Sequence, residues 1–293
     1  MSISANSLNN VRLQETPLPS TEYNQLPHIK DMQKAAASHF KAHAALLGII
    51  AAHGLTDKFS VHLVHKHFDI PEGRIMTYEK VRRQAGEDFV LCSPRDPQKC
   101  PNVRGLYFKA MPDGNMAAYE FTTEPGADLS AHVDFVAEFA LAILKYKVQD
   151  VFALTALPIC PQDKVLTEFE IGHILSTVLV PDASWLSAQD VVMSTSTDWA
   201  ATPDYSQYAD SSVPGIIQLK CTLVRSGKHF NVTCSTTRSG RHLGHVAGSS
   251  SDETPIDSVL TVDGEVLYEG TEPHSVISHA LQLVDVVEPV GMD

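Results

Sequence analysis

Histidines cluster in one short segment of this chain. Ser60–Asp69 contains His62, His65 and His67, and ends in the carboxylate of Asp69. A neutral imidazole is the commonest protein metal ligand, and the unperturbed pKa of histidine lies closest to neutral pH. The segment therefore indicates metal binding or proton transfer.

A strand over residues 58–69 would place alternate side chains on opposite faces. His65, His67 and Asp69 would then share one face, with His62 on the other. The shared face begins with three apolar residues, Phe59, Val61 and Leu63. This pattern predicts a His-x-His pair that enters the core and binds a divalent ion such as iron, zinc or manganese, with Asp69 as a further ligand.

Other interpretations of the segment stand beside metal binding. Two buried imidazoles could act as general acid and base in dehydration, isomerisation or ring closure, if their surroundings separate their pKa values. If the segment were a helix, its polar residues would form a solvated stripe without a functional role. On a strand, a histidine in the core can also be hydrogen-bonded without taking part in function. Gly54, which ends the preceding helix, and the turn at Pro71–Gly73 favour the strand.

Two residues elsewhere are candidates for a third ligand, an acid or a base. Glu120 is a carboxylate inside the short apolar segment 118–121, and His173 alternates with apolar residues in the segment 167–177. Glu168 and Glu170 fall on the face opposite His173. His173 can equally be a hydrogen-bonded core residue.

Composition limits the partners that we expect. The formal charge is −13, and no cluster of lysine and arginine offsets it, so nucleic acid and anionic membrane surfaces are disfavoured. The longest apolar run, Ala44–Ala52, is too short to span a bilayer. Five scattered cysteines and an N-terminus without a secretory pattern predict reduced thiols and a cytoplasmic protein.

The order of elements predicts an α+β fold with mainly antiparallel sheets. We expect a long N-terminal helix over about 29–53, a middle helix over 131–146 and a C-terminal helix over 272–287. Turn residues predict hairpins that pair 104–111 with 116–122, 215–224 with 229–236, and 259–262 with 265–268.

Composition shifts along the chain predict its domain organisation. Residues 1–28 are polar and proline-containing, which is typical of a flexible arm, and residues 29–180 form an α+β domain that carries the histidines. Residues 181–214 are a long loop or linker, which holds both tryptophans. Residues 215–293 form a hairpin-rich part that ends in a helix, either separate from 29–180 or continuous with it.

One resemblance accompanies these patterns. The motif Val64–Asp69 (VHKHFD), followed by Pro71–Gly73 and later by Tyr119–Phe121, resembles uncharacterised small cytosolic proteins of filamentous fungi over about residues 55–180. The resemblance implies a fungal protein of specialised metabolism, and it brings no established activity or fold.

Together these observations predict a small-molecule enzyme. His65 and His67 would be its metal ligands, and Glu120 or His173 its third group. The alternative is a metal-free lyase, isomerase or cyclase that uses the same residues as general acid and base. A second alternative is a non-catalytic ligand-binding or interaction protein whose arm and 181–214 loop contact a partner.

Overall fold

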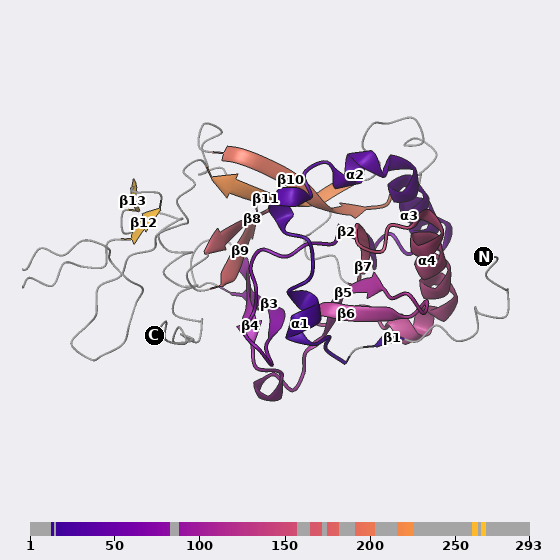
Figure 1. The fold of residues 1–293 in the computed structure, drawn as a ribbon, viewed down its shortest axis with the longest axis horizontal. Coiled ribbons are helices and arrows are strands. Elements are labelled where there is room, and N and C mark those ends of the chain that lie inside the picture. Colours follow the sequence, from indigo (N-terminus) through magenta and orange to yellow (C-terminus); the bar gives the residue numbers. More distant parts are fainter. Residues whose placement is uncertain are drawn as a thin grey trace, which may run out of the picture.

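The protein combines helices with one large sheet in a computed structural model (Figure 1). The structure describes residues 13–14, 16–82, 88–156, 165–171, 175–181, 191–202, 216–224, 260–262 and 265–267. Its α-helices are α1 (Ser20–Tyr23), α2 (Ala35–Ser38), α3 (Phe40–Ala52) and α4 (Val133–Tyr146), and 3₁₀ turns cover Ile29–Asp31, Pro97–Lys99 and Leu129–His132. None of the helices described has the length and hydropathy needed to cross a membrane.

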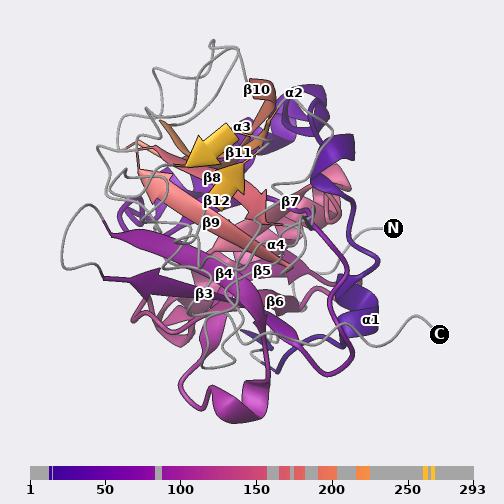
Figure 2. The same ribbon diagram turned by 90° about the vertical axis from the view of Figure 1, so that its left-hand side faces the viewer.

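Eleven strands form the large sheet in the order β1-β6-β3-β4-β9-β8-β11-β10-β2-β7-β5. Their bounds are β1 Leu13–Gln14, β2 Ser60–Leu63, β3 Ile75–Val81, β4 Phe89–Arg95, β5 Arg104–Ala110, β6 Met116–Thr122, β7 Phe152–Thr155, β8 Leu166–Ile171, β9 Ser176–Pro181, β10 Val191–Ala200 and β11 Ile216–Val224. Because β5 also pairs with β6, ten of the strands form a closed ring. The remaining strand, β1, pairs in parallel with β6 and is not part of the ring. Figure 2 shows the sheet from the end opposite α3 and α4.

The sheet is mixed, so the prediction of a mainly antiparallel α+β fold is correct only in part. The hairpin of β5 and β6 is antiparallel as predicted, but β3 pairs with β6, β8 with β11 and β1 with β6 in parallel. Parallel pairs need long crossover connections, which local turn signals do not reveal.

The predicted N-terminal helix over 29–53 is wrong as a single element. Ile29–Asp31 is a 3₁₀ turn whose first N–H donates to the Lys66 carbonyl, and the helix begins afresh after His39, whose backbone is not helical. Within this range the structure has two α-helices instead of one: the short α2 and α3, which has 13 residues. The middle helix is confirmed as α4, which ends at Lys147 in the left-handed conformation. The predicted C-terminal helix lies outside the described residues.

The loop predicted over 181–214 contains a ten-residue strand, β10, which pairs with β2 and β11. Strands from the 29–180 and 215–293 parts therefore share one sheet. The antiparallel pairing of β12 (Leu260–Val262) with β13 (Glu265–Leu267) confirms the last predicted strand pair, whereas residues 229–236 lie outside the described residues. The end of the predicted flexible arm is packed, with Tyr23 and Leu26 buried.

Two buried clusters occupy the two faces of the sheet. Val61 and Leu63 on β2 belong to the apolar core beneath α3 and α4, which lie together at one end of the sheet in Figure 1. His62, between them, stacks instead on Tyr107, in a second cluster that is rich in tyrosine. Because side chains alternate along a strand, this second cluster lies on the inner face of the ring. The inner face is thus buried, and it carries polar side chains as well as apolar ones.

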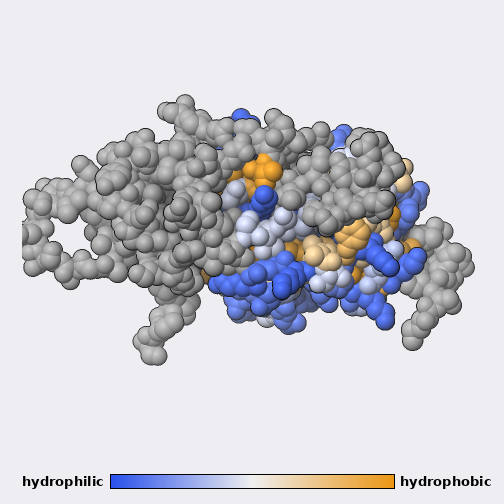
Figure 3. All heavy atoms as spheres, turned by 90° about the horizontal axis from the view of Figure 1, so that it is seen from above, coloured by the Kyte–Doolittle hydropathy of each residue, from blue (hydrophilic) through white to orange (hydrophobic). Residues whose placement is uncertain are grey.

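Polar and charged residues cover much of the described surface that is visible in Figure 3. Among the described residues, the only large hydrophobic side chains that are exposed are Val133 and Tyr146, at 44% and 40%. The apolar residues of the described part are therefore used mainly in its interior.

Gly105 on β5 fits where a larger residue would not. A Cβ atom at this position would collide with the ring of Phe108 and lie 2.8 Å from the Cβ of Ala118. We expect Gly105→Ala to lower the free energy of unfolding by about 1–3 kcal/mol, because overpacking forces the neighbours to shift. Urea unfolding would measure the change, and an unaltered midpoint would contradict this description of the packing.

Candidate metal centre

The histidine segment leaves the sheet where β2 ends at Leu63. Beyond it, the N–H of Lys66 donates to Pro27 and its carbonyl accepts from Ile29, at 2.9 and 3.0 Å. Strand alternation therefore stops before His65. The prediction that His62 faces away from His65 is wrong, because their rings stack with centroids 5.3 Å apart.

The N-terminal arm holds this segment in place. The amide of Asn24 donates to the Ile70 carbonyl at 3.0 Å and accepts from the Ile70 N–H at 2.8 Å. Lys66 donates through its ammonium group to the Asn24 carbonyl and to Asp69. Residues 64–70 are thus fixed by hydrogen bonds at several points, although they belong to no strand.

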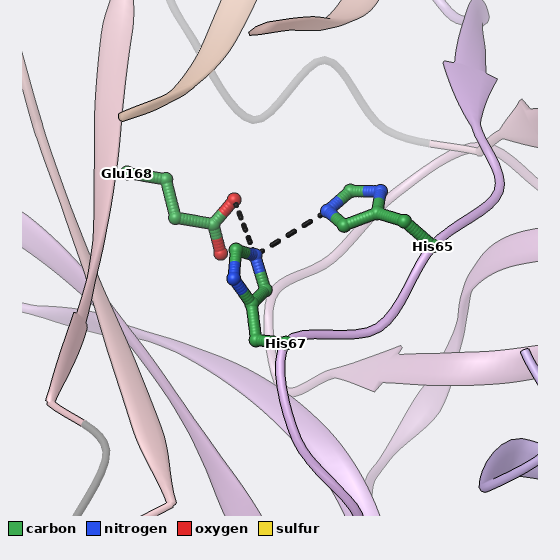
Figure 4. A group of neighbouring side chains, drawn as sticks. All are labelled: His65, His67 and Glu168. Atoms are coloured by element: carbon green, nitrogen blue, oxygen red, sulfur yellow. Dashed lines mark hydrogen bonds and ion pairs between the residues drawn. The ribbon is translucent and has the colours of Figure 1, made fainter. Parts of the chain in front are cut away.

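Three buried side chains converge at this point: His65, His67 and Glu168 of β8 (Figure 4). The His65 Nε2 atom lies 3.3 Å from His67 Nε2, which lies 3.4 Å from Glu168 Oε2. One ligand atom from each residue falls within 4.8 Å of the other two. Two imidazoles and a carboxylate are the donor set of many non-haem iron and zinc sites.

The second nitrogen of each imidazole is already engaged. His65 Nδ1 donates to the Leu63 carbonyl at 2.7 Å, because a carbonyl can only accept. His67 Nδ1 lies 3.0 Å from Glu170 Oε1, on the same strand as Glu168. In the neutral rings, both Nε2 lone pairs then face the cluster. Partners of this kind orient and strengthen metal-ligating histidines.

The carboxylate of Glu168 is oriented in the same way. The Thr177 hydroxyl, on the neighbouring strand β9, donates to Glu168 Oε1 at 2.6 Å, and both residues are fully buried. This bond leaves Oε2 as the oxygen that faces His67. All three candidate ligands therefore have a fixed outer partner.

Burial keeps the lone pair of His65 available at the cluster. The pKa of His65 is lowered to about 3, chiefly by burial and to a smaller extent by the neighbouring imidazoles of His67 and His62. His65 is therefore neutral at pH 7. Burial opposes ionisation of Glu170, but the hydrogen bond and the charge of His67 outweigh it and lower the pKa of that carboxyl.

The observed spacing suits a bound ion. For metal–ligand distances of about 2.0–2.1 Å, two ligands of a tetrahedral site lie about 3.3–3.4 Å apart. The distances from His67 Nε2 to the ligand atoms of His65 and Glu168 are 3.3 and 3.4 Å. The ligand atoms of His65 and Glu168 lie within 4.8 Å of each other, so an ion held by all three atoms would draw these two side chains together where they lie further apart than 3.4 Å.

Glu120 is buried in the same interior but is not part of the cluster. Its two oxygens accept from the hydroxyls of Tyr23 and Tyr78, each at 3.0 Å. The pKa of Glu120 is raised to about 7, chiefly by burial and to a smaller extent by the charge of Glu168, while the two tyrosine hydrogen bonds oppose the shift. Glu120 can thus gain or lose a proton near neutral pH.

The structure brings together only some of the residues that the sequence singled out. His65 and His67 meet as predicted, whereas Asp69 is exposed and pairs with Lys66 at 2.6 Å. His173 lies outside the described residues. Alternation in the sequence assigns Glu168 to the polar face of its strand, and the structure shows that this face is buried at the cluster.

A signal for Glu168 was nevertheless present in the sequence. Glu168 and Glu170 occupy alternate positions of one strand, so a single face of that strand carries two carboxylates. Such a pattern fits a sheet that also buries its polar face.

Loss of an outer partner should weaken metal binding without removing a ligand. We expect Thr177→Val, which replaces the hydroxyl with a group of similar size, to reduce zinc affinity by about 10- to 100-fold. Thr195→Val is a matched control, since this buried threonine has no hydrogen bond to its hydroxyl. Competition titration with a zinc chelator measures both, and equal affinities would contradict the proposed role of Thr177.

Comparisons with known proteins add no information about this site. The chain matches no protein-family model, and comparison with curated proteins and with solved structures finds no match. Any functional conclusion therefore depends on the geometry of the described residues.

Proposed function

We propose that the protein is a small-molecule enzyme that binds a divalent transition metal through His65, His67 and Glu168. Iron(II), zinc and manganese are the ions that accept this donor set, and imidazole ligands favour the first two. A metal held by three protein ligands keeps open positions, at which it can polarise a substrate oxygen or activate a bound water.

The convergence of the three ligand atoms carries this proposal. His65 Nε2, His67 Nε2 and Glu168 Oε2 meet in a buried position, and the other polar atom of each side chain is held by a partner. Buried acceptor atoms that face one another are unfavourable unless a cation or a proton lies among them. A metal ion provides that cation.

Glu120 would transfer protons in such an enzyme. It lies in the same buried interior, and its charge interacts with those of Glu168 and His67. A group with a pKa near the working pH is the most effective general acid or base. The hydroxyls of Tyr23 and Tyr78 would hold its carboxyl group in position.

One observation favours a second candidate function, a metal-free lyase, isomerase or cyclase. His67 lies between two carboxylates, at 3.4 Å from Glu168 and 3.0 Å from Glu170. A proton on His67 could bridge these groups without a metal, and His67 with Glu120 would then act as the acid and base.

Metal content separates the two functions. Protein produced with supplemented iron, zinc and manganese and then freed of loosely bound ions should contain close to one metal equivalent per chain by elemental analysis. We expect His65→Ala/His67→Ala to contain none. A wild-type protein without stoichiometric metal would contradict the metal-dependent function and favour the acid–base alternative.

A further inference from the structure

A second set of buried polar side chains lies beside the metal cluster. We call His62, Tyr107, Tyr119 and Asp198 the interior polar group; each is at most 3% exposed. The imidazole of His62 stacks on the ring of Tyr107, with centroids 3.6 Å apart, and on His65 of the metal cluster at 5.3 Å. The ring centroids of Tyr107 and Tyr119 are 6.1 Å apart.

Part of this group is held by hydrogen bonds on the inner face of the sheet. Asp198 of β10 lies opposite His62 of β2 in the strand register. Its Oδ2 atom accepts from the Thr155 hydroxyl at 2.6 Å and lies 3.4 Å from His62 Nδ1. These contacts fix both side chains, and they engage only one polar atom of each.

Four polar atoms of the group have no hydrogen-bond partner in the structure. They are His62 Nε2, Asp198 Oδ1 and the hydroxyls of Tyr107 and Tyr119. Buried polar atoms without partners are rare in folded proteins, and each one costs stability. Four of them on neighbouring side chains are hydrogen-bonding capacity that a bound polar molecule would satisfy.

The chemistry of these atoms selects the ligand. Asp198 Oδ1 only accepts, and His62 Nε2 also accepts when Nδ1 donates to Asp198. Burial raises the pKa values of Tyr107 and Tyr119 well above the ordinary value, so both hydroxyls stay neutral. No lysine or arginine is buried among the described residues, so an anionic ligand would find no fixed cationic partner there.

We propose that the interior polar group binds a neutral small molecule through at least two hydroxyl groups on a planar ring. The hydroxyls donate to Asp198 Oδ1 and His62 Nε2, and the tyrosine hydroxyls complete the hydrogen bonds. Three of the four members have flat rings, among them the stacked His62 and Tyr107, and such rings suit a flat ligand. This binding does not require the metal, although the contact between His62 and His65 would place the ligand next to it.

Titration of metal-free protein with catechol tests this inference. We expect saturable binding of catechol to chelator-treated wild-type protein in calorimetry, and none of 1,2-dimethoxybenzene, which has the same ring without hydroxyl donors. Tyr107→Phe and Tyr119→Phe should each weaken catechol binding by about 10-fold, the loss expected for one hydrogen bond. Tyr146→Phe changes an exposed tyrosine and should leave the affinity unchanged.

Two results would overturn the inference. One is the absence of saturable binding up to about 10 mM catechol, which would mean that water alone fills the space. The other is binding that both tyrosine substitutions leave unaltered in variants with wild-type thermal unfolding. Because the titration uses metal-free protein, a lack of catechol binding would not contradict the proposed metal centre. Conversely, a protein that binds no metal could still bind catechol.

Discussion

Replacing His65 with alanine is expected to abolish tight binding of a divalent metal ion. The substitution removes one of three ligand atoms and leaves His67 and Glu168 without the geometry that holds an ion. The loss of affinity should exceed the roughly 10- to 100-fold decrease that follows loss of an outer partner. Calorimetric titration of the metal-free variant with zinc would measure it.

His53→Ala provides the matched control for this experiment. His53 follows α3 and pairs with Glu138 of α4 at 2.9 Å, away from the cluster. We expect this variant to bind zinc as the wild type does. If His65→Ala kept the wild-type affinity, or if both histidine variants lost it equally, His65 would not be a ligand.

Acid should destabilise the protein through His43, a buried histidine of α3 that the metal centre does not use. Its imidazole is 2% exposed, stacks on Phe152 and contacts the edge of Trp199. Burial lowers the pKa of His43 from 6.5 to about 3. The unfolded chain therefore takes up a proton below pH 6.5, while the folded protein resists it.

The sign of the effect follows from proton linkage. The contribution of neutral His43 to the free energy of unfolding is fully present above pH 6.5. It is lost as the pH falls toward 3, because the unfolded state binds more protons than the folded state. Between pH 7.5 and 5.0 the loss from His43 amounts to about 2 kcal/mol. His43→Leu should remove this part of the pH dependence, whatever it does to stability at pH 7.5.

Urea unfolding at the two pH values would test this expectation. The difference in the free energy of unfolding between pH 7.5 and 5.0 should be about 2 kcal/mol smaller in His43→Leu than in the wild type. The experiment uses chelator-treated protein, so that bound metal does not contribute to the free energy of unfolding. Identical pH dependences in the two proteins would show that His43 is not held neutral by burial.

Local signals in the sequence predicted the elements well where contacts are local. The hairpin of β5 and β6 follows from the turn at Pro112–Asn115, and α4 follows from apolar residues at helical spacing. The helix predicted over 29–53 failed because its first residues bond to Lys66, far along the chain. Parallel pairs such as β8 and β11 depend on equally distant contacts.

The candidate site also depends on contacts between residues that are far apart in the sequence. Alternation gave the correct apolar face for Phe59, Val61 and Leu63, but the strand stops before His65. The same reasoning assumed that only the apolar face of a strand is buried. Closure of the sheet buries the polar face as well, which is why Glu168 escaped prediction although its position on a strand was recognised.

A crystal structure of the zinc-loaded protein, with anomalous diffraction at the zinc edge, tests the central claim most directly. We predict one strong anomalous peak among His65 Nε2, His67 Nε2 and Glu168 Oε2, at about 2.0–2.2 Å from each. Zinc bound elsewhere, or no peak between these three side chains, would contradict the metal centre proposed here.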